Sequence, residues 1–349
     1  MVKISIIVPI YNVEKYLSAF FKSVESQNFK DYELILINDG STDNSYSYCL
    51  DYKNKHQNVI LINKKNSGVS SARNIGLERA RGKYIYFCDP DDILNSNLLE
   101  ENYEIAEKYK ANVVIFGYDM HSMHRNIMHR NMININVPKK EFLESNHQFQ
   151  KKFPQLCENG FINYVWNKFY LKDSLSNLKF ENVDIGEDFR FNLNYSKKLS
   201  KVYCNPKSYY HYLIDRPNSA MHASWRKNIN YQIEEDKIIV DIINNVWQKK
   251  EDLNFISFKN WLGYRTAQYI LSSSLSIVEK KKLIDKVFSL KDINILNYTP
   301  NSIKEEYNLK VIKYRKYTCI LIIDRLVRSL KNKVRDCKIF CVRMKDSLN

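Results

Sequence analysis

The sequence has few residues that break or bend a chain, because only 8 of its 349 residues are glycine and 7 are proline. This scarcity excludes fibrous and low-complexity proteins. Its 7 cysteines are odd in number and scattered, which indicates reduced thiols rather than a disulfide framework. No apolar stretch approaches the ~20 residues needed to cross a bilayer, and the first apolar run is too short for a signal peptide. We therefore expect a cytoplasmic protein, soluble or peripheral at the inner face of the cell membrane.

The composition that remains is that of a folded but basic protein. Hydrophobic residues make up 44 % and charged residues 27 %, and the net charge is +15. Such a charge suits nucleic acid, anionic lipid or a phosphorylated substrate. Residues 301–349 hold 13 Lys and Arg against 5 Asp and Glu, so +8 of the excess lies in this segment. Its apolar residues recur at three- and four-residue steps, which predicts a basic amphipathic helix that either lies on an anionic membrane surface or packs on protein.

Two alternating patterns organise the first part of the chain. Short β-branched runs predict strands at residues 4–10, 33–37, 59–62, 84–88 and 113–118, and helical patterns separate them at about 14–27, 42–54, 69–80 and 96–109. Apolar strands that alternate with helices predict a mostly parallel sheet covered by helices. From about residue 225 only helical patterns remain, at 226–249, 253–275, 277–289 and 303–345. We expect an α/β domain over residues 1–224 and a helical C-terminal region over residues 225–349.

The most distinctive motif is Asp89-Pro90-Asp91-Asp92, directly after the expected strand 84–88. Three carboxylates within four residues repel one another unless a cation lies between them, and Mg²⁺ or Mn²⁺ prefers carboxylate oxygens. The other interpretation is a solvated turn with an aspartate that caps the following helix. Taken alone, the motif fits both.

Polar and glycine residues also follow the second strand, at the edge of the sheet where ligands bind in such folds. Asp39-Gly40-Ser41-Thr42-Asp43 has the signature of a helix cap at Ser41 or Thr42. Asp39, one residue before the glycine, is well placed to accept hydrogen bonds from a base or ribose. An ordinary strand–turn–helix connection accounts for part of this pattern.

The third strand is followed by a segment from Asn66 to Asn74 that leads into a helix. Gly68 permits close approach of the backbone, and Arg73 supplies a planar donor for a phosphate or carboxylate. Neither a G-x-G-x-x-G nor a G-x-x-x-x-G-K-[ST] motif is present, which argues against dinucleotide-binding and P-loop proteins.

Residues 120–132 are rich in His and Met and have no clear periodicity. His121, His124 and His129 are candidate metal ligands, but their spacing matches no standard zinc pattern. We therefore expect a hairpin or surface loop here.

The motifs together resemble family 2 glycosyltransferases with a GT-A fold, in particular bacterial capsular and exopolysaccharide enzymes. Four elements match in order and spacing over about the first 110 residues: IIVPIYNVE at 6–14, INDGSTD at 37–43, the segment 66–74, and DPDD at 89–92. The resemblance implies inverting transfer from a nucleotide-sugar donor, most often a UDP-sugar, assisted by Mg²⁺ or Mn²⁺. Residues 1–118 would bind the nucleotide-sugar and residues 119–224 would form the acceptor side. Asn38 departs from the pattern, since many relatives carry Asp there.

The resemblance also implies roles for single residues. The metal would be bound by Asp91, with His222 as a candidate further ligand; an isolated His is also commonly structural. The residues that would contact the donor are Pro9, Tyr11, Glu14, Asp39, Asn66, Gly68, Arg73, Asp89, Trp166, Lys168, Arg216 and Ser219. For Trp166, burial in the core is the alternative to packing against a sugar.

Glu187-Asp188, after Gly186, resembles the element that supplies the family's catalytic base. An inverting transfer needs a carboxylate to take the acceptor's hydroxyl proton, which is worth ~10²–10⁴-fold in rate. Asp188 is the expected base, with Glu187 as its neighbour. The structural alternative is a pair of acids that only stabilise a helix N-terminus.

The expected function is therefore synthesis of a bacterial surface polysaccharide, with a saccharide or lipid-linked saccharide as acceptor; a homo-oligomer is compatible with the sequence. An alternative within the family is a transferase that modifies a protein or a teichoic-acid polymer. An alternative of another class is a non-enzymatic nucleic-acid-binding protein. The sequence contains no recognised nucleic-acid-binding module, and the acidic 89–92 edge would repel phosphate without a metal, so we expect no nucleic acid partner.

Overall fold

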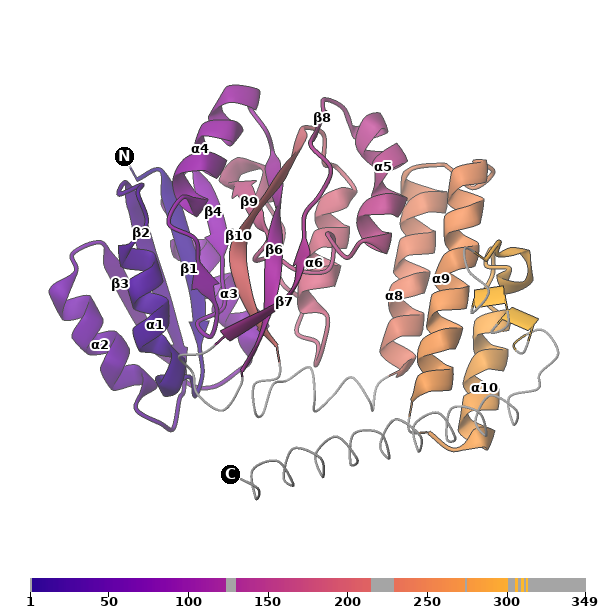
Figure 1. Cartoon of the computed structure of the whole chain (residues 1–349), viewed down its shortest axis with the longest axis horizontal. Coiled ribbons are helices and arrows are strands. Elements are labelled where there is room, and N and C mark those ends of the chain that lie inside the picture. The colour runs from indigo at the N-terminus through magenta and orange to yellow at the C-terminus, as the bar shows by residue number, and fades with distance from the viewer. Residues whose placement is uncertain are drawn as a thin grey trace, which may run out of the picture. The chain divides into compact units, whose positions relative to one another are not determined.

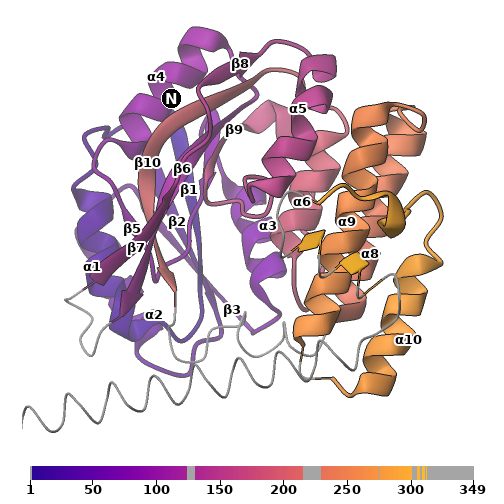
Figure 2. The same cartoon turned by 45° about the vertical axis from the view of Figure 1, so that its right-hand side comes forward.

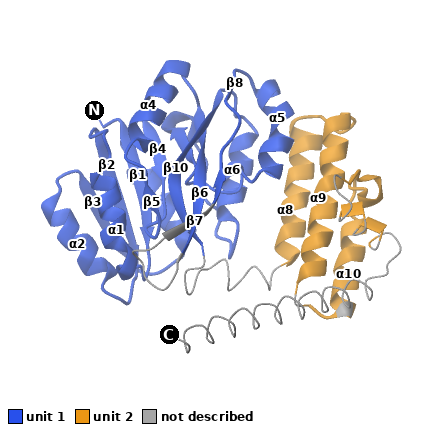
Figure 3. Ribbon diagram, in the orientation of Figure 1, with its two compact units in different colours: residues 1–224 blue, residues 225–349 orange. Residues whose placement is uncertain are grey.

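The computed structural model describes residues 2–123, 130–214, 229–273 and 275–300, together with 305–306, 309–310 and 312. The chain divides into two compact units, residues 1–224 and 225–349 (Figure 3). The first unit is a sheet covered by helices, and the described part of the second is helical (Figure 1). The expected α/β fold with a helical C-terminal region is confirmed.

The first unit is built on one mixed sheet with the strand order β3-β2-β1-β4-β9-β6-β10-β5, to which β7 adds beside β6 and β8 beside β10. The strands are β1 (Ile4–Ile10), β2 (Tyr32–Asp39), β3 (Val59–Lys64), β4 (Tyr84–Phe87), β5 (Ile93–Leu94), β6 (Val113–Met123), β7 (Arg130–Asn136), β8 (Glu141–Leu143), β9 (Lys168–Leu171) and β10 (Val202–Ile214). Strands β1 to β4 pair in parallel, as do β6 and β10, whereas β9 is antiparallel to both of its neighbours. Parallel pairing brings the carboxyl ends of β1 to β4 to one edge of the sheet.

Helices cover both faces of this sheet. The helices of the first unit are α1 (Glu14–Glu25), α2 (Ser45–Lys55), α3 (Val69–Arg79), α4 (Leu98–Tyr109), α5 (Asn146–Glu158) and α6 (Glu187–Ser196), with a 3₁₀ turn η1 (Lys172–Leu175). Figure 2 shows α1, α2 and α4 on one side of the sheet and α3 and α6 on the other. Because both faces are covered, β1 has no alternation of polar and apolar residues, and Ile6, Ile7 and Val8 are all fully buried.

The second unit contains α8 (Ile229–Asp241), a π-helical turn η2 (Ile242–Val246), α9 (Leu253–Ser272), α10 (Ile277–Phe288) and a 3₁₀ turn η3 (Ile295–Asn297). Helix α10 begins with a capping box, in which Ser276 accepts from the Glu279 N–H and the Glu279 side chain accepts in return. Within the described residues, no helix is both long and apolar enough to cross a membrane. The helix expected over residues 303–345 lies almost entirely outside the described residues, so its membrane-binding role stays a prediction.

The connection between β2 and α2 differs from the expected helix cap. Helix α2 begins at Ser45, with Asn44 as its N-cap residue. Ser41 Oγ instead accepts from the Asn12 N–H (3.2 Å), and the Thr42 N–H donates to Asn12 Oδ1 (2.8 Å). The prediction of a cap at Ser41 or Thr42 is therefore wrong, because these polar groups bond to the loop after β1 rather than to the helix.

Candidate active site

One buried arginine joins three acidic side chains from two separate segments at the carboxyl edge of the sheet. The Arg73 side chain, on α3, is only 4 % exposed. Its Nη2 donates to Asp89 Oδ1 (3.0 Å), and its Nη1 donates to Glu187 Oε1 (2.9 Å) and Asp188 Oδ1 (2.7 Å). The two elements expected to hold the metal and the base therefore meet at a shared guanidinium.

Two glycines set the positions of this cluster. Gly76 lies one turn after Arg73, and a Cβ added there would approach Ile7 Cγ2 to 2.3 Å, so the absence of a side chain lets α3 pack close to β1. Gly186 adopts φ 78°, a left-handed conformation that glycine reaches without strain. The chain can thus turn into α6 with Glu187 and Asp188 in its first turn.

The surroundings of Asp188 raise the pKa of its carboxyl group toward neutral pH. Burial raises the pKa of Asp188, Arg73 opposes this, and the charges of Glu187 and Asp89 add to it, so that the pKa rises to about 7. The Asp188 side chain keeps 14 % of its surface exposed, and its Oδ2 accepts from the Val165 N–H (3.2 Å). A carboxyl group of this kind can exchange a proton with a bound hydroxyl at neutral pH.

In the Asp89-Pro90-Asp91-Asp92 motif, Asp91 and Asp92 are buried and Asp89 is partly exposed. Asp92 is buried; its Oδ2 accepts from the Tyr210 hydroxyl (2.6 Å) and its Oδ1 from the Leu213 N–H (2.7 Å). Burial, together with the neighbouring charges of Asp91 and Asp89, raises its pKa well above the ordinary value. Asp92 therefore anchors the motif to β10.

The motif does not cap the following helix, because β5 intervenes and the N-cap residue of α4 is Asn97. The capping alternative is thus excluded. Asp89, with 27 % of its side chain exposed, and Asp91, which is 7 % exposed, offer the carboxylate oxygens that Mg²⁺ and Mn²⁺ prefer. The crowding of three acids fits a divalent cation, since a cation would relieve their repulsion.

Asp39 connects β2 to the loop that precedes α3. Its Oδ1 accepts from the Ser67 N–H (2.9 Å), its Oδ2 accepts from the Gly68 N–H (2.8 Å), and Lys64 donates its amine to the same carboxylate. A carboxylate has about four acceptor sites, so about one remains for a ligand. Asn66 lies close to Gly40, the residue after Asp39: a Cβ added at Gly40 would lie 2.7 Å from the Asn66 backbone nitrogen.

The residues expected around the nucleoside lie at the end of β1. Pro9 is within the strand and pairs with Ile37, whereas Tyr11, just beyond it, is 49 % exposed. The Glu14 carboxylate accepts from both the backbone N–H (2.9 Å) and the side-chain amide (3.0 Å) of Asn44. Of these side chains, Tyr11 is the one most open to a ligand.

The sequence model described as Glycosyl transferase family 2 matches residues 5–179, half of the chain. The chain belongs to glycosyltransferase family 2. It is 31 % identical over 292 residues to the uncharacterized glycosyltransferase EpsJ of Bacillus subtilis, covering 80 % of this chain and 82 % of EpsJ. It is 33 % identical over 254 residues to the minor teichoic acid biosynthesis protein GgaB of the same organism, covering 70 % of this chain but 27 % of GgaB.

The solved structures agree on the fold. The chain resembles a crystal structure of S. aureus TarS in complex with UDP-GlcNAc, with a TM-score of 0.55 at 18 % identity, covering 90 % of this chain and 92 % of that one. The glycosyltransferase therefore has the GT-A fold that its sequence predicts. Membership of this family also sets aside the non-enzymatic nucleic-acid-binding alternative.

Two residues expected in the glycosyltransferase's donor site lie in its core. Trp166 is 2 % exposed and stacks on Tyr210 at 4.4 Å between ring centroids. The Lys168 amine donates to the carbonyl oxygens of Phe161 (2.6 Å) and Tyr164 (2.5 Å). Burial lowers the pKa of Lys168 to about 7. Trp166 is therefore buried in the core, as its alternative interpretation predicts. Lys168 is also buried, and its amine holds the segment from Phe161 to Tyr164 through two carbonyl oxygens.

The Lys168→Met variant is expected to lose about 1–3 kcal/mol of stability, because buried carbonyl oxygens would lose their donor. The KM for the donor substrate is expected to stay unchanged. Urea unfolding and initial rates test this, with Lys179→Met as the control, since the Lys179 side chain is 71 % exposed. A raised KM for the donor together with wild-type stability would contradict this structural role and support Lys168 as a donor-binding residue.

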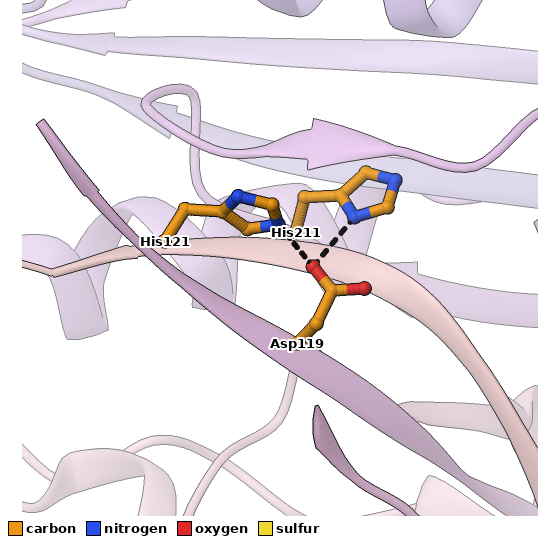
Figure 4. Close-up of side chains that lie close together, drawn as sticks. All are labelled: Asp119, His121 and His211. Carbon is orange, nitrogen blue, oxygen red and sulfur yellow. Dashed lines mark hydrogen bonds and ion pairs between the residues drawn. The ribbon is translucent and has the colours of Figure 1, made fainter. Parts of the chain in front are cut away.

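The expected ligands Arg216, Ser219 and His222 lie outside the described residues, and their roles stay predictions. The structure also brings together Asp119, His121 and His211 (Figure 4), a group of which the sequence indicated only His121. The His- and Met-rich segment does begin in a hairpin, because β6 and β7 are antiparallel neighbours. The sequence signal was the D-x-H spacing at 119–121, which places both side chains on one face of a strand, but β6 was expected to end at Tyr118.

Proposed function

We propose that this enzyme is an inverting glycosyltransferase that moves a sugar from a UDP-sugar to an acceptor hydroxyl, with Asp188 as the general base. The observation that carries the proposal is a partly exposed Asp188 carboxyl that the buried Arg73 holds next to Asp89; burial also raises the pKa of Asp188 to about 7. A base with a pKa near the working pH takes a proton most effectively. The family resemblance of the Glu187-Asp188 element supports the same assignment.

In this proposal Arg73 and the two acids of α6 that it contacts have different roles in the transfer. Asp188 takes the acceptor's hydroxyl proton while the acceptor oxygen attacks the anomeric carbon from the face opposite the leaving diphosphate. Arg73 holds the Asp188 carboxylate in place and limits how far its pKa rises. Glu187 acts on Asp188 through its charge and through the shared guanidinium.

Asp91 is proposed to hold the diphosphate end of the donor through Mg²⁺ or Mn²⁺, and Asp89 to lie near the ribose or the donor sugar. When bound, such a cation offsets the negative charge that grows on the leaving diphosphate. Asp39, Asn66 and Gly68 form the nearby loop edge, and Tyr11 offers an exposed ring at the end of β1. TarS was crystallised with UDP-GlcNAc, which supports a uridine nucleotide as donor.

The proposed acceptor is a growing bacterial surface polysaccharide of the capsule or exopolysaccharide type, or its lipid-linked precursor. A teichoic-acid polymer is a second candidate, favoured by the 33 % identity to GgaB, a minor teichoic acid biosynthesis protein. The chain spans 27 % of GgaB and 82 % of EpsJ. Both acceptor classes present hydroxyl groups to the same base, so the site chemistry is shared.

The donor is expected to be found among UDP-Glc, UDP-Gal, UDP-GlcNAc and UDP-GalNAc, with one of them releasing UDP at least tenfold faster than the others. EDTA should abolish the release, and Asp91→Asn should lower it by ~10²-fold or more, because the leaving group loses its cation. A coupled assay for UDP on the purified full chain measures this.

The matched control is Asp51→Asn, an exposed aspartate on α2 whose loss should leave the rate unchanged. Circular dichroism should give the same fold for both variants. Full UDP release in EDTA, or by Asp91→Asn, would contradict the metal assignment, and release from no UDP-sugar would contradict the proposed donor.

A further inference from the structure

A separate cluster of potential metal ligands lies where β6 and β10 run side by side. Asp119 pairs in register with His211 across these parallel strands, and His121 follows Asp119 by two residues, on the same face of β6. One ligand atom from each side chain lies within 4.8 Å of the other two. Figure 4 shows both imidazole rings directed at the Asp119 carboxylate.

The contacts converge on a single oxygen. His211 Nδ1 lies 2.7 Å from Asp119 Oδ1, and His121 Nε2 contacts the same atom. Ser208 Oγ donates to the other oxygen, Oδ2 (2.9 Å), which fixes the rotation of the carboxylate. Outer hydrogen bonds of this kind commonly orient the ligands of metal sites.

We propose that Asp119, His121 and His211 form a second metal site, which binds a divalent transition-metal ion, with Zn²⁺ as the ion tested. Imidazole nitrogens favour Zn²⁺ and its neighbours in the first row, whereas Mg²⁺ and Ca²⁺ favour oxygen ligands. Three protein ligands leave the fourth tetrahedral position for water. The exposed fractions of the three side chains are 9 % for Asp119, 15 % for His121 and 29 % for His211, so the ion would enter from the His211 side.

This site shares no residue with the proposed donor site, and the two differ in chemistry. Asp89 and Asp91 offer only oxygen, whereas the second cluster offers two nitrogens and one oxygen. The two are connected through β10, because Tyr210, next to His211, donates to Asp92. A metal bound at the second site would clamp β10 to β6 and so fix the strand that holds the Asp89–Asp92 motif.

The test uses the whole 349-residue chain, stripped of metal with a chelator and titrated with Zn²⁺ in the absence of nucleotide. We expect one equivalent of Zn²⁺ that depends on the two histidines, measured by competition with a chromophoric chelator. The double variant His121→Ala/His211→Ala should bind this equivalent at least 100-fold more weakly. The melting temperature of the wild type should rise when Zn²⁺ is added, whereas that of the double variant should stay unchanged.

Two controls separate this site from others. His147→Ala, which removes an exposed histidine of α5, and Asp91→Asn, at the donor site, should both keep the wild-type affinity for Zn²⁺. Co²⁺ bound to the wild type should show d–d absorption without a thiolate charge-transfer band, which excludes cysteine ligands and needs no variant. His211→Gln, at the most exposed of the three positions, provides a milder substitution should the double variant fail to fold.

Equal Zn²⁺ affinity in the wild type and the His211→Gln variant would overturn the proposal. So would the absence of Zn²⁺ binding by the wild type, which would leave the three side chains as a hydrogen-bonded group. Neither result would affect the assignment of Asp188 or of the donor site, because those residues are tested separately.

Discussion

Asp188→Asn is expected to lower the transfer rate by ~10²–10⁴-fold while the fold and donor binding survive. Asparagine has nearly the same shape and can still accept from Val165, but its amide cannot take the acceptor's proton. The loss should therefore appear in kcat rather than in the KM for the donor. Initial rates with the preferred UDP-sugar and its acceptor measure both constants.

The pH profile gives an independent signature of the same residue. Because the pKa of Asp188 is raised to about 7 and the base must be ionised, the wild-type rate should fall as the pH drops below about 7. The Asp188→Asn variant should have lost this acidic limb. Asp184→Asn, an exposed aspartate shortly before α6, is the matched control and should keep both rate and profile. Full turnover by Asp188→Asn would remove this carboxylate from the mechanism.

Arg73→Met is expected to lower the free energy of unfolding by about 3–5 kcal/mol, because three acids would lose their shared buried cation. For a unit of this size, each kcal/mol corresponds to roughly 2–4 °C in Tm. The defect should grow as the pH rises, since ionisation of Asp188, whose pKa burial raises to about 7, adds to the repulsion among the three acids. At low pH Asp188 binds a proton and the variant recovers part of its stability. Urea unfolding at several pH values measures the effect.

Arg79→Met is the matched control for this prediction, since Arg79 lies on the same helix but is exposed. Its stability should stay within about 0.5 kcal/mol of the wild type. Arg73→Lys should recover only part of the loss, because an ammonium group cannot reproduce the planar fork that reaches three carboxylates. Wild-type stability of Arg73→Met at pH 8 would contradict a compensating role for the guanidinium.

The local pattern of apolar residues was sufficient to predict the strands of the parallel part of the sheet. The runs at 4–10 and 59–62 lie in β1 and β3, the run at 84–88 extends one residue beyond β4, and Glu187 does open a helix. Strand and helix periodicity are properties of neighbouring residues. The family motifs also predict Arg73, Asp89 and Asp188 as site residues, and the structure brings the three together.

What could not be predicted depends on contacts between distant segments. Arg73 and Asp188 are 115 positions apart, and no local signal shows that they share an ion pair. The sequence left Trp166 open between the donor site and the core and predicted Lys168 in the donor site; only the stacking of Trp166 on Tyr210 and the bond from Lys168 to the Phe161 carbonyl show that both are buried. Asp119 and His211 were missed because pairing of β6 with β10 determines their proximity.

The contact of Gly76 with Ile7 has a practical consequence for anyone who wishes to alter the sugar preference of this enzyme. A directed-evolution library that randomises α3 would shift the whole helix at any substitution of Gly76, because no space exists there for a single methyl group. Arg73 would move with it, and the acids that depend on Arg73 would lose their alignment. Position 76 is therefore better kept fixed in such a library.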